Sequence, residues 1–361
     1  MLTAIRNFSD RVLGRGSAAT TVPVMDGTLR ANRVLDDATR VADLPGIDDL
    51  ASDGSTLWAS AGSTLYRIDG GTVAPAKTFD AEITAIAARA GIVAVALGGR
   101  SIHVMQVRGV EASEIAKLDR LGNPLVCVNA LSFDGDDQLL FSEGSQRLGP
   151  TDWCRDLMEL GRSGRAGCWN FRSGVATELA RGLEYAFGVL AQNGVVRVSE
   201  SWRHRVVDMA SGKPVLAELP GYPSRMAPAS EGGFWLTCFV CRTQLVEFVL
   251  REPAYRQRML AEIDPRYWIA PALASGQSFL EPLQGAGVKQ MGVLKPWAPP
   301  RSYGLVVLVG SDGQVRRSLH SQVDGENHGI TGIAEHDGRL FVASKGSGRL
   351  LSVGLAVGAQ A

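Results

Sequence analysis

Histidine is the side chain that most readily exchanges protons near neutral pH, and this chain has five histidines. His328 stands just before the strand-like segment Ile330-Thr331, and there it is a candidate general base for hydrolysis. The alternative is a hydrogen-bonded structural histidine. The chain has no Gly-x-Ser-x-Gly elbow, phosphate loop or His-Glu-x-x-His motif, so serine-nucleophile, nucleotide and zinc-protease chemistry lack support.

A second group of reactive side chains lies in residues 252–300, where proline and glycine interrupt every periodic pattern. A long ordered excursion of this kind is typical of a lid or a partner surface, and the alternative is a structural cap. If the segment covers a site, Glu281, Lys295 and Trp297 would face the ligand, and an apolar lid would lower the pKa of the lysine. Otherwise these charges are solvated or paired at the surface.

The five cysteines give an odd count in a chain without an export signal, which favours reduced thiols and a cytoplasmic location. Cys238 and Cys241 form a Cys-x-x-Cys sequence inside a strand pattern. Residues three apart on a strand face opposite sides, so these two thiols are not expected to share a metal ion.

A sequence repeat predicts the elements that position these residues. In each copy, a polar turn precedes a short apolar run. Asn-Gly and Asp-Gly supply the positive φ angles of tight hairpins. Six hairpins at a period of roughly 40 residues predict an all-β fold, a six-bladed β-propeller. The turns are Asp53-Gly54, Ala90-Gly91, Asp134-Gly135, Asn193-Gly194, Gly232-Gly233 and Asp337-Gly338.

We expect an N-terminal arm over 1–30, the propeller over 31–354 and a tail over 355–361. Residues 222–251 are expected to supply the inner strands of blade five and 301–320 its outer strands, so that 252–300 is a lid-like insertion within this blade. Blade six lacks one strand, which the segment from Arg33 to Val41 can supply. That strand would close the ring and remove two exposed edges. A shorter insertion around 149–164 carries Trp153, which we expect at the rim opposite the lid.

Composition excludes some partners. Lys plus Arg and Asp plus Glu are both 37, and we find no basic patch, so nucleic-acid binding is not expected. No apolar stretch is long enough to span a bilayer, and the N-terminal residues 1–13 have the spacing of a short helix packed on the propeller, or of an interfacial anchor. The expected partner is a small molecule; the oligomeric state stays open.

Several motifs resemble the strictosidine synthase-like family. Glu200-Ser201-Trp202-Arg203-His204-Arg205-Val206 is similar to its Glu-Thr-x-x-x-Arg-Ile signature. The sequences of its next and last blades are similar to Leu219-Pro220-Gly221-Tyr222-Pro223 and to Glu335-His336-Asp337-Gly338. The resemblance implies a six-bladed propeller akin to the gluconolactonase and paraoxonase groups. These relatives include calcium-dependent lactonases and arylesterases and a metal-free plant enzyme that condenses an amine with an aldehyde.

The resemblance also implies where a calcium site would lie. Asp48 and Asn129 match the family's ligands at the first and third inner strands, but Phe187 replaces an Asn, and Ser224-Arg225 replace Asp-Asn. Calcium needs six to eight oxygen ligands with carboxylate charge. Calcium is therefore not expected as a cofactor, with a site on Asp48 and Asn129 as the weak alternative. The plant enzyme's essential Glu falls on Thr331, so its reaction is not carried over.

A guanidinium can replace the ion, because it bonds carboxylates bidentately and stays charged when buried. We therefore expect Arg225 to pair with Asp48, either as a purely structural ion pair or also to orient a ligand. The favoured function is hydrolysis of a small ester or lactone, with His328 as base and with Arg225 and Asn129 polarising the carbonyl. Asp48, Phe187, Ser224 and Thr331 are expected to contact the substrate. The alternatives are a non-catalytic binding propeller and a metal-independent lyase or condensing enzyme.

Overall fold

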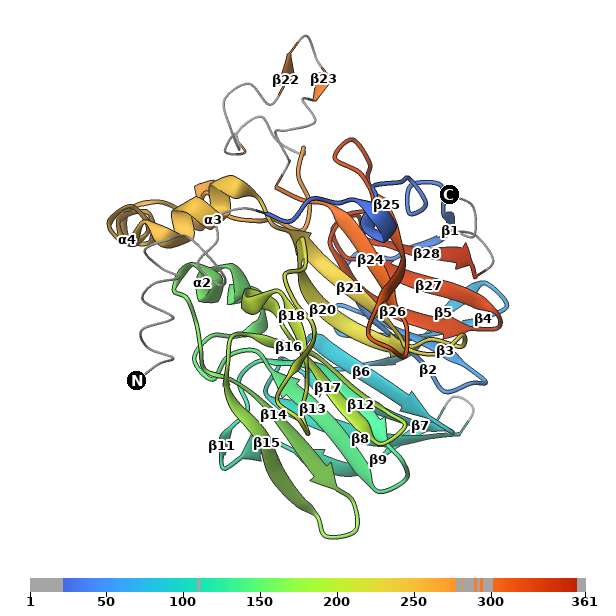
Figure 1. Ribbon diagram of the computed structural model, residues 1–361. Helices are drawn as coiled ribbons and strands as arrows, with labels where there is room; N and C mark the ends of the chain where they lie inside the picture. Colours follow the sequence, from blue (N-terminus) through green and yellow to red (C-terminus); the bar gives the residue numbers. More distant parts are fainter. Residues whose placement is uncertain are drawn as a thin grey trace.

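Six four-stranded antiparallel sheets stand in a ring around a common axis in the computed structural model (Figure 1). The structure describes residues 22–108, 111–276, 281, 289–290, 293–294 and 301–355. The chain is therefore a six-bladed β-propeller, as the repeated turns predict.

The strands of the first three blades follow one another without interruption, from the axis outward. Blade one holds β2 (Ile47–Ser52), β3 (Leu57–Ala61), β4 (Thr64–Asp69) and β5 (Thr72–Thr78). Blade two holds β6 (Ile83–Arg89), β7 (Ile92–Leu97), β8 (Ser101–Arg108) and β9 (Glu111–Leu118). Blade three holds β12 (Val128–Asp134), β13 (Gln138–Glu143), β14 (Gly164–Asn170) and β15 (Val175–Leu183).

Blade four is again continuous, but the last two blades take strands from separated parts of the chain. Blade four holds β16 (Ala186–Gln192), β17 (Val195–Glu200), β18 (Arg205–Asp208) and β19 (Pro214–Leu216). Blade five holds β20 (Gly221–Pro228), β21 (Phe234–Cys241), β24 (Gly304–Val309) and β25 (Val315–Ser321). Blade six holds β26 (Ile330–His336), β27 (Arg339–Ser344), β28 (Arg349–Gly354) and β1 (Thr39–Asp43).

The ring is closed by β1, which pairs antiparallel with β28 and so joins the beginning of the described chain to its end. The closing strand predicted between Arg33 and Val41 is thus found at Thr39–Asp43. The preceding stretch lies along β25, where Leu35 N–H donates to the His320 carbonyl and Asn32 Nδ2 donates to the Ser318 carbonyl. This stretch includes the short 3-10 helix η2 (Gly27–Leu29) and shields an edge strand that would otherwise be open to pairing.

Each predicted turn joins the first strand of a blade to the second. Asn193 and Gly194 have φ of 52° and 75°, and Asp337 and Gly338 have φ of 46° and 69°. Positive φ at two consecutive residues is the geometry of the tight hairpin that Asn-Gly and Asp-Gly favour. The turn residues therefore set the strand boundaries within each blade.

The segment after β21 differs from the expectation. We expected the inner strands of blade five to extend to residue 251, but β21 ends at Cys241 and helix α3 (Gln244–Arg251) begins. The Thr243 hydroxyl caps this helix by accepting from Val246 N–H. Helix α4 (Pro253–Glu262) and the 3-10 helix η5 (Pro265–Tyr267) follow, so the first part of the insertion is helical.

The shorter insertion joins β13 to β14 and contains η3 (Pro150–Asp152) and helix α2 (Trp153–Met158). Helices α2, α3 and α4 lie on the same face of the ring (Figure 1). Small two-stranded sheets are formed by β10 (Arg120–Leu121) with β11 (Asn123–Pro124) and by β22 (Lys289–Gln290) with β23 (Val293–Leu294), and the 3-10 helix η4 (Ser201–Arg203) follows β17. None of the described helices is long and apolar enough to cross a membrane.

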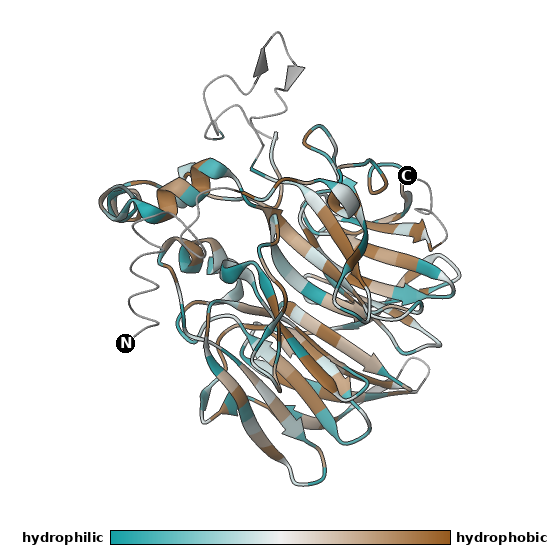
Figure 2. Ribbon diagram, in the orientation of Figure 1, coloured by the Kyte–Doolittle hydropathy of each residue, from teal (hydrophilic) through white to brown (hydrophobic). Residues whose placement is uncertain are grey.

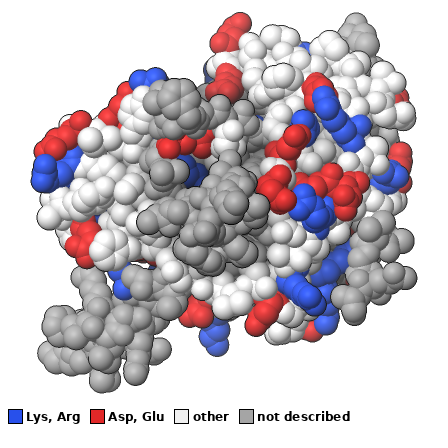
Figure 3. Space-filling model, turned by 90° about the horizontal axis from the view of Figure 1, so that it is seen from above, with Lys and Arg blue, Asp and Glu red and all other residues white. Residues whose placement is uncertain are grey.

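Hydrophobic residues are concentrated along the inner and middle strands, and hydrophilic residues are common at the outer strands and turns (Figure 2). Facing sheets pack these strands together; Trp235 of blade five, for example, lies in one cluster with Ile333 and Val342 of blade six. On the face seen from above, the described Lys, Arg, Asp and Glu residues are interspersed (Figure 3). The balanced composition is thus also balanced over this face.

Ion pairs with buried carboxylates link the second and third strands of two blades. Glu143 at the end of β13 pairs with Arg165 on β14, and Glu200 at the end of β17 pairs with Arg205 on β18. Arg165 also donates to the carbonyls of Leu121, Asn123 and Pro124. Because removal of one partner of a buried pair leaves an uncompensated charge, these pairs are expected to matter for stability.

Replacing Arg165 by methionine tests this expectation. The side chains of Arg165 and Glu143 are 1% and 0% exposed, so the Arg165→Met variant should lose about 3–5 kcal/mol in the free energy of unfolding measured with urea. The matched control is Arg172→Met, since the Arg172 side chain is 78% exposed beside Asp137, and its unfolding midpoint should not move. Equal midpoints for both variants would contradict a stabilising role of the buried pair.

Candidate functional site

The inner strand of every blade carries a β-bulge at the same point, near its beginning. A bulge bends the strand and re-aims the backbone groups of the extra residue, here next to the axis of the ring. In blade four the bulge requires glycine, because a Cβ on Gly188 would come within 2.2 Å of the Ser224 carbonyl oxygen. The bulged residues are Asp48, Thr84, Asn129, Phe187-Gly188, Ser224-Arg225 and Thr331.

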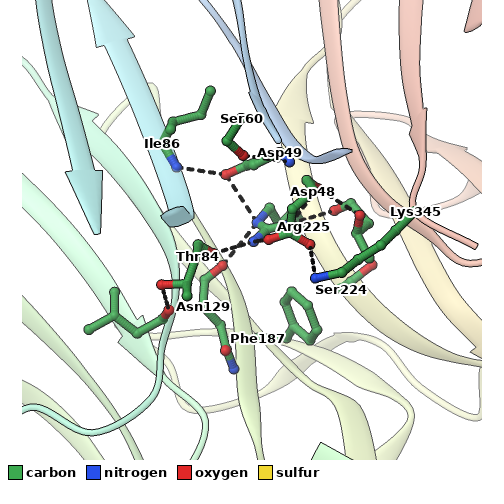
Figure 4. A network of polar contacts seen from close by, with 12 residues as sticks. Asp48, Asp49, Ser60, Thr84, Ile86, Asn129, Phe187, Ser224, Arg225 and Lys345 are labelled. Carbon is green, nitrogen blue, oxygen red and sulfur yellow. Dashed lines mark hydrogen bonds and ion pairs between the residues drawn. The ribbon is translucent and has the colours of Figure 1, made fainter. Parts of the chain in front are cut away.

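The guanidinium of Arg225 lies where these bulges converge (Figure 4). Its Nη1 donates to the carbonyls of Asp48 and Thr331, at 2.9 Å and 3.1 Å. Its Nη2 lies 2.6 Å from the Thr84 carbonyl oxygen, and its Nε lies 2.9 Å from the Asn129 carbonyl oxygen. The Phe187 ring centroid lies 5.3 Å from the guanidinium carbon. Arg225 itself belongs to blade five, so one side chain contacts the inner strands of all six blades.

Two carboxylates and a lysine complete this charged centre. Arg225 Nη2 lies 2.9 Å from Asp48 Oδ2, and Arg225 Nε lies 3.1 Å from Asp49 Oδ2. The other oxygen of Asp48 lies 2.9 Å from the Nζ of Lys345. Burial by itself would raise the pKa of Asp48, but Arg225 and Lys345 lower it to about 2. Burial raises the pKa of Asp49 to about 6, against the opposing effect of Arg225.

Side-chain hydrogen bonds also run from blade to blade around the axis. Every neighbouring pair of blades has one, so these hydrogen bonds form a closed circle through all six blades, with Ser199 of β17 as the donor from blade four. The donors and acceptors, in order, are Ile86 N–H to the Asp49 carboxylate, Thr84 Oγ1 to the Val128 carbonyl, Asn129 Nδ2 to the Ala186 carbonyl, Ser199 Oγ to the Ser224 carbonyl, Ser224 Oγ to the Ile330 carbonyl and Thr331 Oγ1 to the Asp48 carbonyl.

A cavity of about 270 Å³ adjoins the axial guanidinium. Its lining includes the beginnings of inner strands and the connections that join second to third strands in blades three, five and six. These two kinds of segment meet because they lie at the same face of a propeller. The lining residues are Asp48, Glu82, Ile83, Thr84, Asn129, Pro150, Thr151, Trp153, Tyr185, Phe187, Arg225, Phe239, Leu273, Thr331 and Lys345.

The structure brings most of the expected axial residues to this cavity: Asp48, Asn129, Phe187, Arg225 and Thr331 line it, and the predicted pair of Arg225 with Asp48 is present. Ser224 is fully buried and is not among the described lining residues. Its hydroxyl is used within the fold, since it bonds to the Ile330 carbonyl and lies 2.7 Å from Thr237 Oγ1.

His328 lies elsewhere. The residue is 4% exposed and is not among the described residues that line the cavity. Nε2 lies 2.7 Å from the Gln322 carbonyl oxygen and must donate to it, and Nδ1 lies 2.8 Å from the Ser302 hydroxyl. Burial lowers the pKa of His328. Both ring nitrogens are thus occupied, which fits the structural alternative for this histidine.

The residues expected from the insertions have different outcomes. Glu281 accepts a hydrogen bond from Gly276 N–H, at 2.9 Å, and is not among the described lining residues. The side chains of Lys295 and Trp297 lie outside the described residues. Leu273 of the long insertion and Trp153 of the shorter one do reach the cavity, so both insertions contribute to its wall.

Sequence reasoning missed Lys345, Glu82, Thr84 and Asp49. Lys345 follows the end of β27 and Glu82 precedes β6, so each stands at a strand end on the face where the inner strands begin. That placement follows from the strand order of a propeller, so the sequence could have indicated Lys345 and Glu82 as site residues. The roles of Thr84 and Asp49 depend on the bulges, which no residue pattern predicts.

The donor set at the axis does not fit a calcium ion. Both oxygens of Asp48 face cations, and the carbonyls of the bulged strands are taken by Arg225. In the parts of the chain that the structure describes, no group of three or more His, Cys, Asp and Glu residues is placed to hold a metal.

Comparisons with known proteins agree with this architecture. No family model matches the chain. The chain is 25% identical to the adipocyte plasma membrane-associated protein of Mus musculus over 358 residues, which cover 89% of this chain and 79% of the relative. It is 27% identical to strictosidine synthase-like 10 of Arabidopsis thaliana over 232 residues, which cover 62% of this chain and 56% of the relative.

Solved structures show the same fold at lower identity. A gluconolactonase from Xanthomonas campestris has a TM-score of 0.54 at 14% identity, covering 92% of this chain and 94% of its own. The calcium-binding protein regucalcin from Agrobacterium tumefaciens has a TM-score of 0.50 at 10% identity, covering 88% and 93%. The chain is therefore a six-bladed propeller with weak similarity to strictosidine synthase-like 10, whose family the sequence motifs resemble, and to the adipocyte plasma membrane-associated protein.

Proposed function

We propose that this protein hydrolyses a small ester or lactone in the axial cavity, without a calcium ion. The observation that carries the proposal is the cavity itself: it lies at the axis, has room for a small molecule at about 270 Å³, and combines charged groups with aromatic rings. The gluconolactonase among the propellers of this fold supports lactone chemistry as the reaction class. Fold alone does not decide function, so the remaining support must come from the groups in the cavity.

Independence from calcium is supported by the charge at the axis. Arg225 and Lys345 balance Asp48 and Asp49, so a divalent cation would meet two fixed positive charges. A calcium ion that enters the site loses water ligands, and protein oxygens must replace them. The oxygens at the axis already accept hydrogen bonds from the guanidinium.

The second candidate is a propeller that binds a small molecule and does not transform it. It is favoured because Arg225, Thr84 and Thr331 donate their hydrogen bonds to backbone carbonyls of the protein and not into the cavity. Ligand binding without turnover in the experiments below would support this candidate.

Chelation tests the absence of a catalytic metal. Aryl esters and lactones should be hydrolysed with the same kcat/KM in excess EDTA, in excess Ca²⁺ and in neither, because no step needs the ion. The same additions should leave the melting temperature unchanged. Activity that disappears with EDTA and returns with Ca²⁺ would refute the proposal.

Removal of the Arg225 guanidinium should create a calcium site at the axis. The Arg225→Ala variant leaves the buried Asp49 carboxylate without a cation and Asp48 with Lys345 alone, so its melting temperature without Ca²⁺ should fall strongly. The freed carbonyls and carboxylates are calcium ligands, so Ca²⁺ at about 100 times its dissociation constant should restore about 2.7 kcal/mol to this variant alone. If Ca²⁺ has the same effect on both proteins, Arg225 does not stand in for an ion.

His328 should behave as a structural residue in this reaction. The His328→Ala variant removes two buried hydrogen bonds, although the Ser302 hydroxyl keeps Ser275 and the Gln322 carbonyl keeps Gly325 N–H as partners, and it should lose about 1–3 kcal/mol of stability in chemical denaturation. Its kcat, per folded molecule and well below its melting temperature, should match the unmodified protein. A well-folded variant with a kcat reduced by orders of magnitude would instead identify His328 as the base.

A further inference from the structure

We infer that Lys345 binds and polarises the carbonyl oxygen of the substrate, while the rings of Trp153, Phe187 and Phe239 hold the apolar part next to it. The inference rests on the hydrolase function proposed above and assigns its electrophilic group. It also narrows the substrate class to uncharged esters or lactones with an apolar, preferably aromatic, group beside the carbonyl.

The argument begins with the donors that the cavity can offer. A guanidinium has five N–H groups, and Arg225 directs all of them to acceptors of the protein. The hydroxyls of Thr84 and Thr331 donate to the carbonyls of Val128 and Asp48. Asn129 Nδ2 donates to the Ala186 carbonyl, and the Asn129 side chain also hydrogen-bonds to the Tyr185 hydroxyl. These groups are committed to holding the blades together.

Lys345 is different. An ammonium group has three N–H donors, and among the described residues Asp48 is the hydrogen-bond partner of the Lys345 ammonium. The side chain is 34% exposed, against 6% for Arg225. Two of its donors are therefore available to an oxygen atom in the cavity.

The ammonium is also held in place. Asp48 has its pKa lowered to about 2, so it stays ionised and keeps its bond to Lys345, and Arg225 fixes the other oxygen of the same carboxylate. The backbone after Lys345 is tightly packed, since a Cβ on Gly346 would come within 2.1 Å of the Leu273 carbonyl oxygen. A preorganised cation of this kind costs little reorganisation when negative charge develops on a carbonyl oxygen.

Aromatic rings form the wall beside this cation. The Phe239 ring centroid lies 5.2 Å from that of Trp153 and 5.1 Å from that of Phe187. The three side chains come from blades three, four and five, so packing fixes the wall. Such rings bury apolar or aromatic groups and offer few partners for the hydroxyls of a sugar. Charge favours a neutral ligand, because Arg225 and Lys345 are already balanced by Asp48 and Asp49.

The reaction then needs an acceptor for one proton, and Glu82 is the lining carboxylate besides Asp48 in the described chain. Water attacks the carbonyl carbon, its proton passes to Glu82, and the electron pair of the C=O bond moves to the oxygen beside Lys345. When this pair returns, the bond to the alkoxy oxygen breaks and Glu82 gives its proton to the leaving oxygen. The products are a carboxylate, with its proton released to solvent, and an alcohol, or one hydroxy acid from a lactone.

The experiment uses the full chain, the Lys345→Met and Lys345→Arg variants, and Lys213→Met as a control at an exposed turn. Probes are phenyl acetate, dihydrocoumarin and phenyl methylphosphonate, an uncleaved mimic of the tetrahedral oxyanion. Lys345→Met should fold, because Arg225 still pairs with Asp48, and its melting temperature checks this. Its kcat should fall by about 100-fold or more with a smaller change in KM, and its phosphonate affinity by at least tenfold. Lys345→Arg should retain much of the kcat and of the phosphonate affinity. Lys213→Met should leave the kcat and the phosphonate affinity unchanged.

Each outcome separates this assignment from the hydrolase proposal. If folded Lys345→Met hydrolyses the esters and binds the phosphonate like the unmodified protein, the assignment of Lys345 is wrong. If the unmodified protein binds the phosphonate through Lys345 and hydrolyses neither ester nor lactone, hydrolysis fails and the oxygen-binding role of Lys345 stands. If it neither binds nor hydrolyses these probes, both are overturned. Glu82→Gln should lower kcat for the ester and the lactone, and an unchanged kcat would exclude Glu82 as the proton acceptor.

Discussion

The guanidinium of Arg225 joins the inner strands of six blades at one point, and the rest of the structure is arranged around that contact. Bulged strands present carbonyl oxygens to the axis, where partial negative charges would otherwise crowd together without a partner. A buried cation needs compensating charge, and Asp48 and Asp49 supply it. The circle of hydrogen bonds between neighbouring strands fixes the positions from which these groups act.

This arrangement separates the structural role of the axis from its chemistry. Because Arg225 is fully bonded, it stabilises the ring and has no donor left for a ligand. Beside the strand residues Phe187 and Phe239, the groups that can meet a ligand lie in connections between strands: Lys345, Trp153 and Leu273. Connections carry function on many scaffolds since they tolerate change that a packed strand does not. A propeller that fills its axis with an arginine can thus keep a cavity at the same face.

The fold was largely predictable because its signals are local. A turn such as Asn193-Gly194 needs positive φ at both residues, so the dipeptide itself specifies a hairpin and its position. The closing strand could be inferred from the strand that blade six lacked. The end of β21 was missed because Thr243 starts a helix through a single hydroxyl contact, whereas the apolar run around it suits a strand equally well. The expected pairing of Arg225 with Asp48 followed from the family resemblance, which implied that both residues lie at the axis, and from their opposite charges.

The sequence by itself determined the number of blades, the closing strand and the residues at the beginnings of the inner strands, because each depends on neighbours along the chain. Only the tertiary structure decided which of those residues can still bond to a ligand. His328 and Arg225 are chemically competent as residue types, but contacts with Ser302, Gln322 and the bulged carbonyls occupy them. Lys345 is an ordinary lysine in a turn until Asp48, 297 positions away, holds its ammonium at the cavity. Hydrogen-bond partners at such separations are set by packing, and residue spacing carries no record of them.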